Sequence, residues 1–103
     1  MIKLALFARL EAKPGKEAAV ADFLETGLAL ARKEATAPIW FALRLSATTF
    51  GVFDAFHDEA GRQAHLSGPI AQALMAKAPE LFASPPSIEP IEVLGLKNTA
   101  GAM

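Results

Sequence analysis

The sequence contains no cysteine, and this absence excludes three kinds of chemistry at once. A chain of 103 residues without a thiol cannot form a disulfide, bind a metal through thiolates or use a cysteine nucleophile. The sequence also lacks a glycine-rich phosphate loop, a serine nucleophile elbow and a pair of carboxylates spaced for acid–base catalysis. None of these common catalytic signatures can therefore explain what the protein does.

Excess charge and long apolar runs are missing as well. Ten basic and eleven acidic residues are scattered along the chain and leave a net charge of −1, so no basic stripe is present to neutralise phosphates. No apolar run approaches the roughly 20 residues of a membrane span, and the first residues alternate without the apolar core of a secretory signal. We therefore expect a cytoplasmic protein that binds neither nucleic acid nor membrane.

Apolar residues, in contrast, are abundant. They make up 52% of the sequence, which is at the top of the usual range of roughly 45–50%. A chain of this size buries only roughly 65% of its unfolded surface, so a monomer has difficulty hiding so much apolar surface. The length allows one domain, which we place at residues 1–98, with a flexible tail at 99–103. The excess of apolar residues predicts a homodimer.

The spacing of the apolar residues predicts the order β-α-β-β-α-β. Strands are expected at residues 2–12, 39–47, 50–57 and 87–97, where alternation and turn signals agree. Helical spacing begins after Lys16 and again after Asp58, and the second helix is interrupted at residues 67–69 and ends at Pro79.

This order corresponds to an α+β, ferredoxin-like fold. Two right-handed crossovers place both helices on one face of a four-stranded antiparallel sheet with the strand order 4-1-3-2. Pro90 indicates that the last strand is an edge strand. The other face of the sheet carries apolar residues that no helix covers, and a second copy of the sheet would cover them.

Two side chains are candidates for proton transfer. His65 titrates near neutrality and could take a proton from an acidic substrate, although a surface or core histidine is an equally good interpretation. Asp54 interrupts an apolar strand, and a buried carboxylate needs a partner. Arg44, on the neighbouring strand, is the expected partner. His57 ends the same strand as Asp54 and is interpreted as a solvated turn residue.

The contact between Arg44 and Asp54 depends on the hairpin that joins their strands. Thr48 and Thr49 lack the glycine or asparagine that a two-residue turn requires, so we expect a three-residue loop. This loop places Arg44 and Asp54 on the same face of the sheet. Their ion pair would either position a substrate or only fix the hairpin.

Trp40 and Phe56 are the large aromatic residues that could line a pocket, with core packing as the alternative for each. The two histidines have no nearby acidic pair at the spacing of metal ligands, which predicts that the protein binds no metal.

Two stretches of the sequence resemble the antibiotic biosynthesis monooxygenase family. The first is residues 7–17, Phe-Ala-Arg-Leu-Glu-Ala-Lys-Pro-Gly-Lys-Glu, which resembles the family's opening strand, Pro-Gly turn and helix start. The second is residues 53–56, Phe-Asp-Ala-Phe, followed by His65-Leu66 nine residues later. There the family has an acid and an aromatic residue, commonly tryptophan, before a helix with His-Leu. The resemblance spans residues 2–97.

The resemblance implies a dimeric α+β barrel, in which two sheets pack face to face and each protomer has its own cavity. Active members of this family oxidise anthrones and quinols with molecular oxygen, without flavin or metal. Haem-degrading relatives carry an asparagine on the first strand and a tryptophan and a histidine on the second helix. Here the corresponding positions hold Phe7 or Ala8, His65 and Met75, which argues against haem.

Three functions are compatible with the resemblance and the residues. The leading hypothesis is a cofactor-independent monooxygenase acting on a small aromatic molecule. In it, His65 is the base, Trp40 and Phe56 are aromatic walls, and Asp54 with Arg44 is a positioning pair. The alternatives are a non-catalytic dimer that binds a small apolar molecule, and a cofactor-free isomerase or cyclase that uses the same base.

Overall fold

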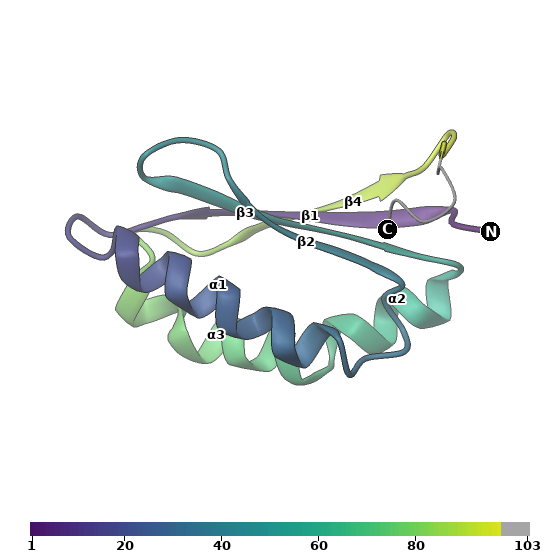
Figure 1. The fold of residues 1–103 in the computed structure, drawn as a ribbon, viewed down its shortest axis with the longest axis horizontal. Helices are drawn as coiled ribbons and strands as arrows, with labels where there is room; N and C mark the ends of the chain where they lie inside the picture. Colours follow the sequence, from purple (N-terminus) through teal and green to yellow (C-terminus); the bar gives the residue numbers. More distant parts are fainter. Residues whose placement is uncertain (98–103) are drawn as a thin grey trace.

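The fold is a four-stranded antiparallel sheet with all helices on one of its faces (Figure 1). The structure, a computed structural model, describes residues 1–97. The elements are β1 (Leu4–Glu11), α1 (Glu17–Ala31), β2 (Ile39–Arg44), β3 (Thr49–Phe56), α2 (Glu59–Leu66), α3 (Pro69–Leu81) and β4 (Ser87–Glu92). The predicted tail at residues 99–103 lies outside the described residues.

The strand order is β2-β3-β1-β4, which confirms the predicted order and the ferredoxin-like α+β fold. Among the described residues β4 pairs only with β1, so Pro90 lies on an edge strand, where its missing N–H breaks no ladder. The first turn is also as the sequence indicates, because Gly15 follows Pro14 with a φ of 84°, a conformation that glycine adopts at little cost.

The hairpin between β2 and β3 has the predicted parity. The Leu45 N–H donates to the Thr49 carbonyl over 2.8 Å, which leaves three residues in the loop. The Ser46 hydroxyl accepts hydrogen bonds from the N–H groups of Thr48 and Thr49, so the chain turns there and β2 ends at Arg44 instead of continuing to residue 47. Even-numbered residues of both strands consequently face the helices.

The second helix is divided into α2 and α3, as the break at residues 67–69 predicts. Asp58 caps α2 by accepting a hydrogen bond of 2.8 Å from the Gly61 N–H, and Pro69 occupies the first turn of α3. The prediction that this helix ends at Pro79 is wrong, because α3 continues to Leu81. The Lys13 ammonium donates to the Pro79 carbonyl over 2.6 Å and anchors this last turn.

The main core lies between the helices and the sheet at the end nearest the first turn. It consists of apolar side chains from both layers: Ala8, Leu10, Ala12, Val20, Leu24, Phe50, Val52, Leu74, Leu81 and Phe82. Beyond this core the two layers enclose the site described below. None of the helices within residues 1–97 is long and apolar enough to cross a membrane.

Candidate active site

His65 lies in the last turn of α2 and points into the protein. Only 5% of its surface is exposed, because α2 packs against β1 and β3. The ring of Phe56, at the end of β3, lies against the imidazole with 5.4 Å between the ring centroids. The short helix and the aromatic contact together fix the orientation of His65.

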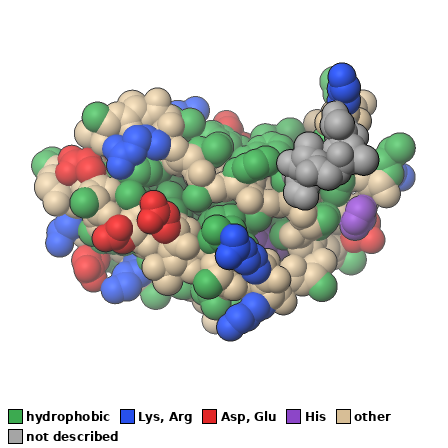
Figure 2. All heavy atoms as spheres, viewed as in Figure 1, with side chains coloured by type: hydrophobic (Ala, Val, Ile, Leu, Met, Phe, Trp, Pro, Cys, Tyr) green, Lys and Arg blue, Asp and Glu red, His purple; other side chains and the backbone are tan. Residues whose placement is uncertain are grey.

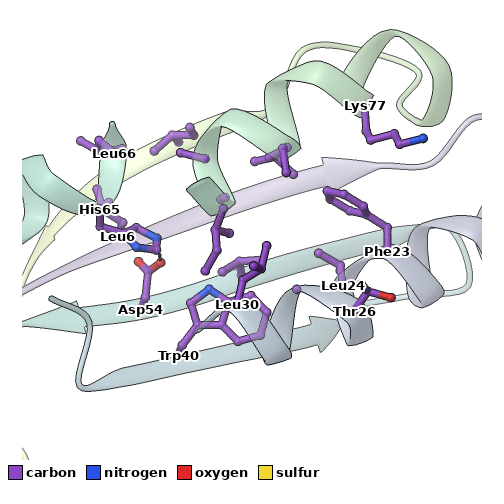
Figure 3. Close-up of a pocket in the computed structure, with 18 residues that line it drawn as sticks. Leu6, Phe23, Leu24, Thr26, Leu30, Trp40, Asp54, His65, Leu66 and Lys77 are labelled. Carbon is purple, nitrogen blue, oxygen red and sulfur yellow. Dashed lines mark ion pairs between the residues drawn. The ribbon is translucent and has the colours of Figure 1, made fainter. Parts of the chain in front are cut away.

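The two ring nitrogens of His65 contact two carboxylates from different parts of the chain. Nε2 lies 2.7 Å from Asp54 Oδ2 on β3, and Nδ1 lies 3.0 Å from Glu34 Oε1, in the connection between α1 and β2. Figure 3 shows the contact with Asp54 as a dashed line. When both carboxylates are ionised, two hydrogen bonds require a proton on each nitrogen, which is the imidazolium form.

The surroundings of His65 act on its pKa in opposite directions. Burial lowers the pKa, but the hydrogen bonds and negative charges of Asp54 and Glu34 outweigh burial and raise the pKa above its ordinary value of 6.5. The site therefore favours a charged imidazolium held between two carboxylates near neutral pH.

This pKa shift predicts how stability depends on pH. A histidine whose pKa is higher in the folded than in the unfolded state contributes stability that is fully present below about pH 6.5. That contribution is lost as the pH rises through the folded-state value. Urea unfolding between pH 6 and 9 should therefore show falling stability, and His65→Gln should flatten this fall. His57→Gln is the control because His57 is exposed; a fall that persists in His65→Gln would contradict the assignment.

The predicted pair of Arg44 and Asp54 is wrong. In the β2–β3 ladder Asp54 is opposite Trp40, whereas Arg44 is opposite Phe50, so the two charges share a face but lie at different points along the strands. The Arg44 guanidinium lies over the Phe50 ring and donates to the Ala47 carbonyl. Arg44 does not line the cavity at Asp54, and the partner of Asp54 is His65.

A cavity of about 320 Å³ lies between the sheet and the helices, with Asp54 and His65 in its wall. Its other walls are almost entirely apolar and come from all four strands and from α1, α2 and α3. In Figure 3, Asp54, His65 and Trp40 lie near one end of the cavity, and Phe23 and Lys77 lie near the other. The volume is at the lower limit for ligand pockets, roughly 300–1,000 Å³, so the cavity suits a compact molecule.

The aromatic residues are divided between the cavity and the core. Trp40 lines the cavity, and its indole packs over Gly27 of α1, where a Cβ would lie 3.5 Å from the ring. The prediction that Phe56 forms a wall is wrong, because Phe56 is fully buried behind His65, beside Leu6 and Ala37. Phe56 thus supports His65 instead of facing a ligand.

Glu34 is the site residue that the sequence did not indicate. It lies in an irregular connection, where neither helical nor strand periodicity marks a buried position. Its side chain is 14% exposed, and Thr36 donates to the same oxygen that contacts His65, over 3.2 Å. Because Asp54 and Glu34 lie on opposite nitrogens of the ring, these carboxylates do not converge on one point where a metal could bind. No cluster of three or more possible metal ligands occurs within residues 1–97.

Two buried polar atoms at the cavity are unpaired within residues 1–97. They are Asp54 Oδ1 and Trp40 Nε1, a hydrogen-bond acceptor and a donor. Leaving such atoms without a partner costs free energy. Glu34 Oε2 is a third buried atom without a partner within residues 1–97, but Glu34 does not line the cavity.

Comparison with known structures places the chain in a family. No family model and no curated protein matches it. The fold is that of proposed antibiotic biosynthesis monooxygenases from Nitrosomonas europaea (TM-score 0.79, 14% identity, 89% of this chain and 90% of the other) and Deinococcus radiodurans (TM-score 0.75, 18% identity, 95% and 99%). The resemblance drawn from the sequence is thus confirmed at the level of the fold.

A much closer likeness is to NE2512, a protein of unknown function from Nitrosomonas europaea. The two chains are 63% identical over 98% of each, with a TM-score of 0.94. This chain belongs to the same family as NE2512.

Proposed function

We propose that the protein is a cofactor-independent monooxygenase that oxidises a small hydroxylated aromatic molecule, of the quinol or anthrone kind, with molecular oxygen. The observation that carries the proposal is the apolar cavity in which a buried carboxylate, Asp54, has one oxygen bonded to His65, while the other oxygen has no partner within residues 1–97. The likeness in fold to proposed antibiotic biosynthesis monooxygenases supports it.

In this proposal the base is Asp54, in place of His65, the base predicted from the sequence. Both nitrogens of His65 are bonded to carboxylates, so neither is available to a substrate. Asp54 Oδ1 accepts the substrate's proton, while the imidazolium holds the carboxylate in place. The Trp40 N–H then stabilises the negative charge that develops on the substrate oxygen.

Oxygen reacts with the resulting anion. An anthrone can isomerise to a hydroxylated tautomer by moving a proton from its ring CH2 group to its oxygen. Loss of the hydroxyl proton to Asp54 then gives an anion. This anion passes one electron to oxygen, which forms a carbon radical and superoxide. The two radicals combine through a new C–O bond, and the proton returns to give a hydroperoxide. Elimination of water leaves a carbonyl group, so one oxygen atom enters the product and the other leaves as water. Apolar walls keep the radical pair together.

Oxygen consumption with a panel of anthrones and hydroquinones tests the proposal. Uptake above the spontaneous rate is expected. Absence of uptake with every member would contradict the proposal for these substrates. Substrate conversion without oxygen would instead indicate an isomerase or cyclase, and binding without any conversion would indicate a carrier of small molecules.

We also propose that the helix-free face of the sheet binds a second copy of the chain. Phe41, Phe53 and Phe7 are opposite one another on neighbouring strands and form an aromatic row across this face. Phe41 is 45% exposed, and its ring centroid lies 6.3 Å from that of Phe53. Figure 2, which views the sheet edge-on, shows hydrophobic side chains along the border of the sheet with charged groups scattered among them. An exposed apolar patch of this kind is typical of an interface.

Light scattering at micromolar concentration should give the mass of a dimer. Two sheets packed face to face would bury on the order of 2,000 Å² or more, as in obligate homodimers. Phe41→Lys should shift the mass to that of a monomer, because it places two charges at the interface. Leu28→Lys adds the same charge to an exposed site on α1 and should remain dimeric. A monomeric wild-type protein would contradict the interface.

A further inference from the structure

The unpaired acceptor and the unpaired donor of the cavity are direct neighbours in the sheet. Asp54 and Trp40 are opposite each other in the β2–β3 ladder, on the face that points to the helices. Side chains at opposite positions have their Cβ atoms roughly 4.5–5.5 Å apart. The unpaired acceptor and the unpaired donor are thus carried by side chains that start next to each other in the sheet.

The contact with His65 fixes the hydrogen-bonding character of Asp54. Oδ2 accepts a hydrogen bond from the histidine Nε2–H over 2.7 Å, and an ionised carboxylate has no proton of its own to donate. Only 3% of Asp54 is exposed, so bulk water does not readily replace a missing partner. At this point the cavity requires a group that donates a hydrogen bond, while the indole of Trp40 requires one that accepts.

We infer that the cavity selects the hydroxyl form of its ligand over the corresponding carbonyl form. A hydroxyl can donate to Asp54 Oδ1 and accept from Trp40 Nε1 at the same time. A carbonyl or an ether can satisfy Trp40, but its lone pairs would face the negative oxygen of Asp54. A ligand that is already an anion would be repelled in the same way.

This inference rests on the proposed function and adds product release to it. For a hydroquinone, or for the hydroxylated tautomer of an anthrone, oxidation converts the hydroxyl that the site binds into a carbonyl that the site rejects. The substrate therefore competes effectively with the accumulated product.

Calorimetric titration with three ligands of one carbon skeleton tests the selectivity without any oxidation. Carvacrol carries a phenolic hydroxyl, its methyl ether lacks the donor, and carvone carries a ketone. Carvacrol should bind the wild-type protein about 10- to 100-fold more tightly than the other two, because only it pairs Asp54 Oδ1. Equal affinity for all three, or binding of none, would overturn the inference.

Two variants show which side chain produces the preference for the hydroxyl. Asp54→Asn removes the charge of the acceptor and should lower the preference for carvacrol over carvone by about tenfold. Trp40→Phe should weaken all three ligands similarly and leave this preference unchanged, because each of them can accept from the indole. Asp22→Asn makes the same chemical change on the exposed surface of α1 and should leave the affinities for all three ligands unchanged.

A preference for carvacrol that survives Asp54→Asn would contradict the role of Asp54. If the Asp54→Asn protein does not fold, the wild-type affinities for the three ligands alone test the selectivity.

The selectivity and the proposed activity can fail separately. Preference for carvacrol without oxygen uptake on the anthrone and hydroquinone panel would support the selectivity and contradict the monooxygenase. Oxygen uptake together with equal binding of the three ligands would support the enzyme and contradict the selectivity.

Discussion

Replacing Asp54 by asparagine is expected to slow oxygen consumption by about 10²–10⁴-fold, the usual contribution of a general base. The amide has nearly the shape of the carboxylate and can still hydrogen-bond to His65, but it cannot accept the substrate's proton. The effect should therefore appear in kcat at saturating substrate. An oxygen electrode, with the spontaneous rate subtracted, gives this quantity.

The control for this experiment is Asp22→Asn, which alters an exposed carboxylate of α1 and should retain the wild-type rate. Circular dichroism shows whether each variant keeps its secondary structure. A folded Asp54→Asn protein with wild-type turnover would show that the base is a different group.

Replacing His65 by alanine is expected to destabilise the fold by about 3–5 kcal/mol, the cost of removing one partner of a buried ion pair. Asp54 and Glu34 would both lose the cation between them, and Phe56 would lose its packing partner. Urea unfolding at pH 6, where the imidazolium is present, measures the difference at equal protein concentration.

His57→Ala is the matched control, because His57 follows the end of β3 and is exposed; it should change stability little. A His65→Ala protein as stable as His57→Ala would mean that the two buried carboxylates do not depend on His65. Together, these results would separate a structural role of His65 from the role of Asp54 in turnover.

Much of the fold could be predicted because local sequence features determine where the helices, strands and turns begin and end. Asp58 is a good helix cap, Gly68-Pro69 both stops and restarts a helix, and Pro90 suits only an edge. The absence of glycine and asparagine at Thr48-Thr49 was sufficient to predict the parity of the hairpin. These signals depend on a few neighbouring residues, so a single sequence is enough to interpret them.

The site could be predicted only in part, because it depends on distances along the strands and between layers. The parity of the hairpin predicts that Arg44 and Asp54 share a face of the sheet. It does not predict which residue lies opposite each of them. His65 comes from α2, and its approach to Asp54 requires the packing of a helix on the sheet. Glu34 is recognisable only once the connection after α1 has been placed beside His65.

The most direct test of the central claim, that Asp54 Oδ1 is where the ligand's hydroxyl binds, is a crystal structure of the protein with carvacrol. The aromatic ring is predicted to lie in the cavity beside Trp40, with the phenolic oxygen about 2.6–3.2 Å from Asp54 Oδ1. A carvacrol molecule bound outside this cavity, or one with its hydroxyl directed toward the end near Lys77, would contradict the claim.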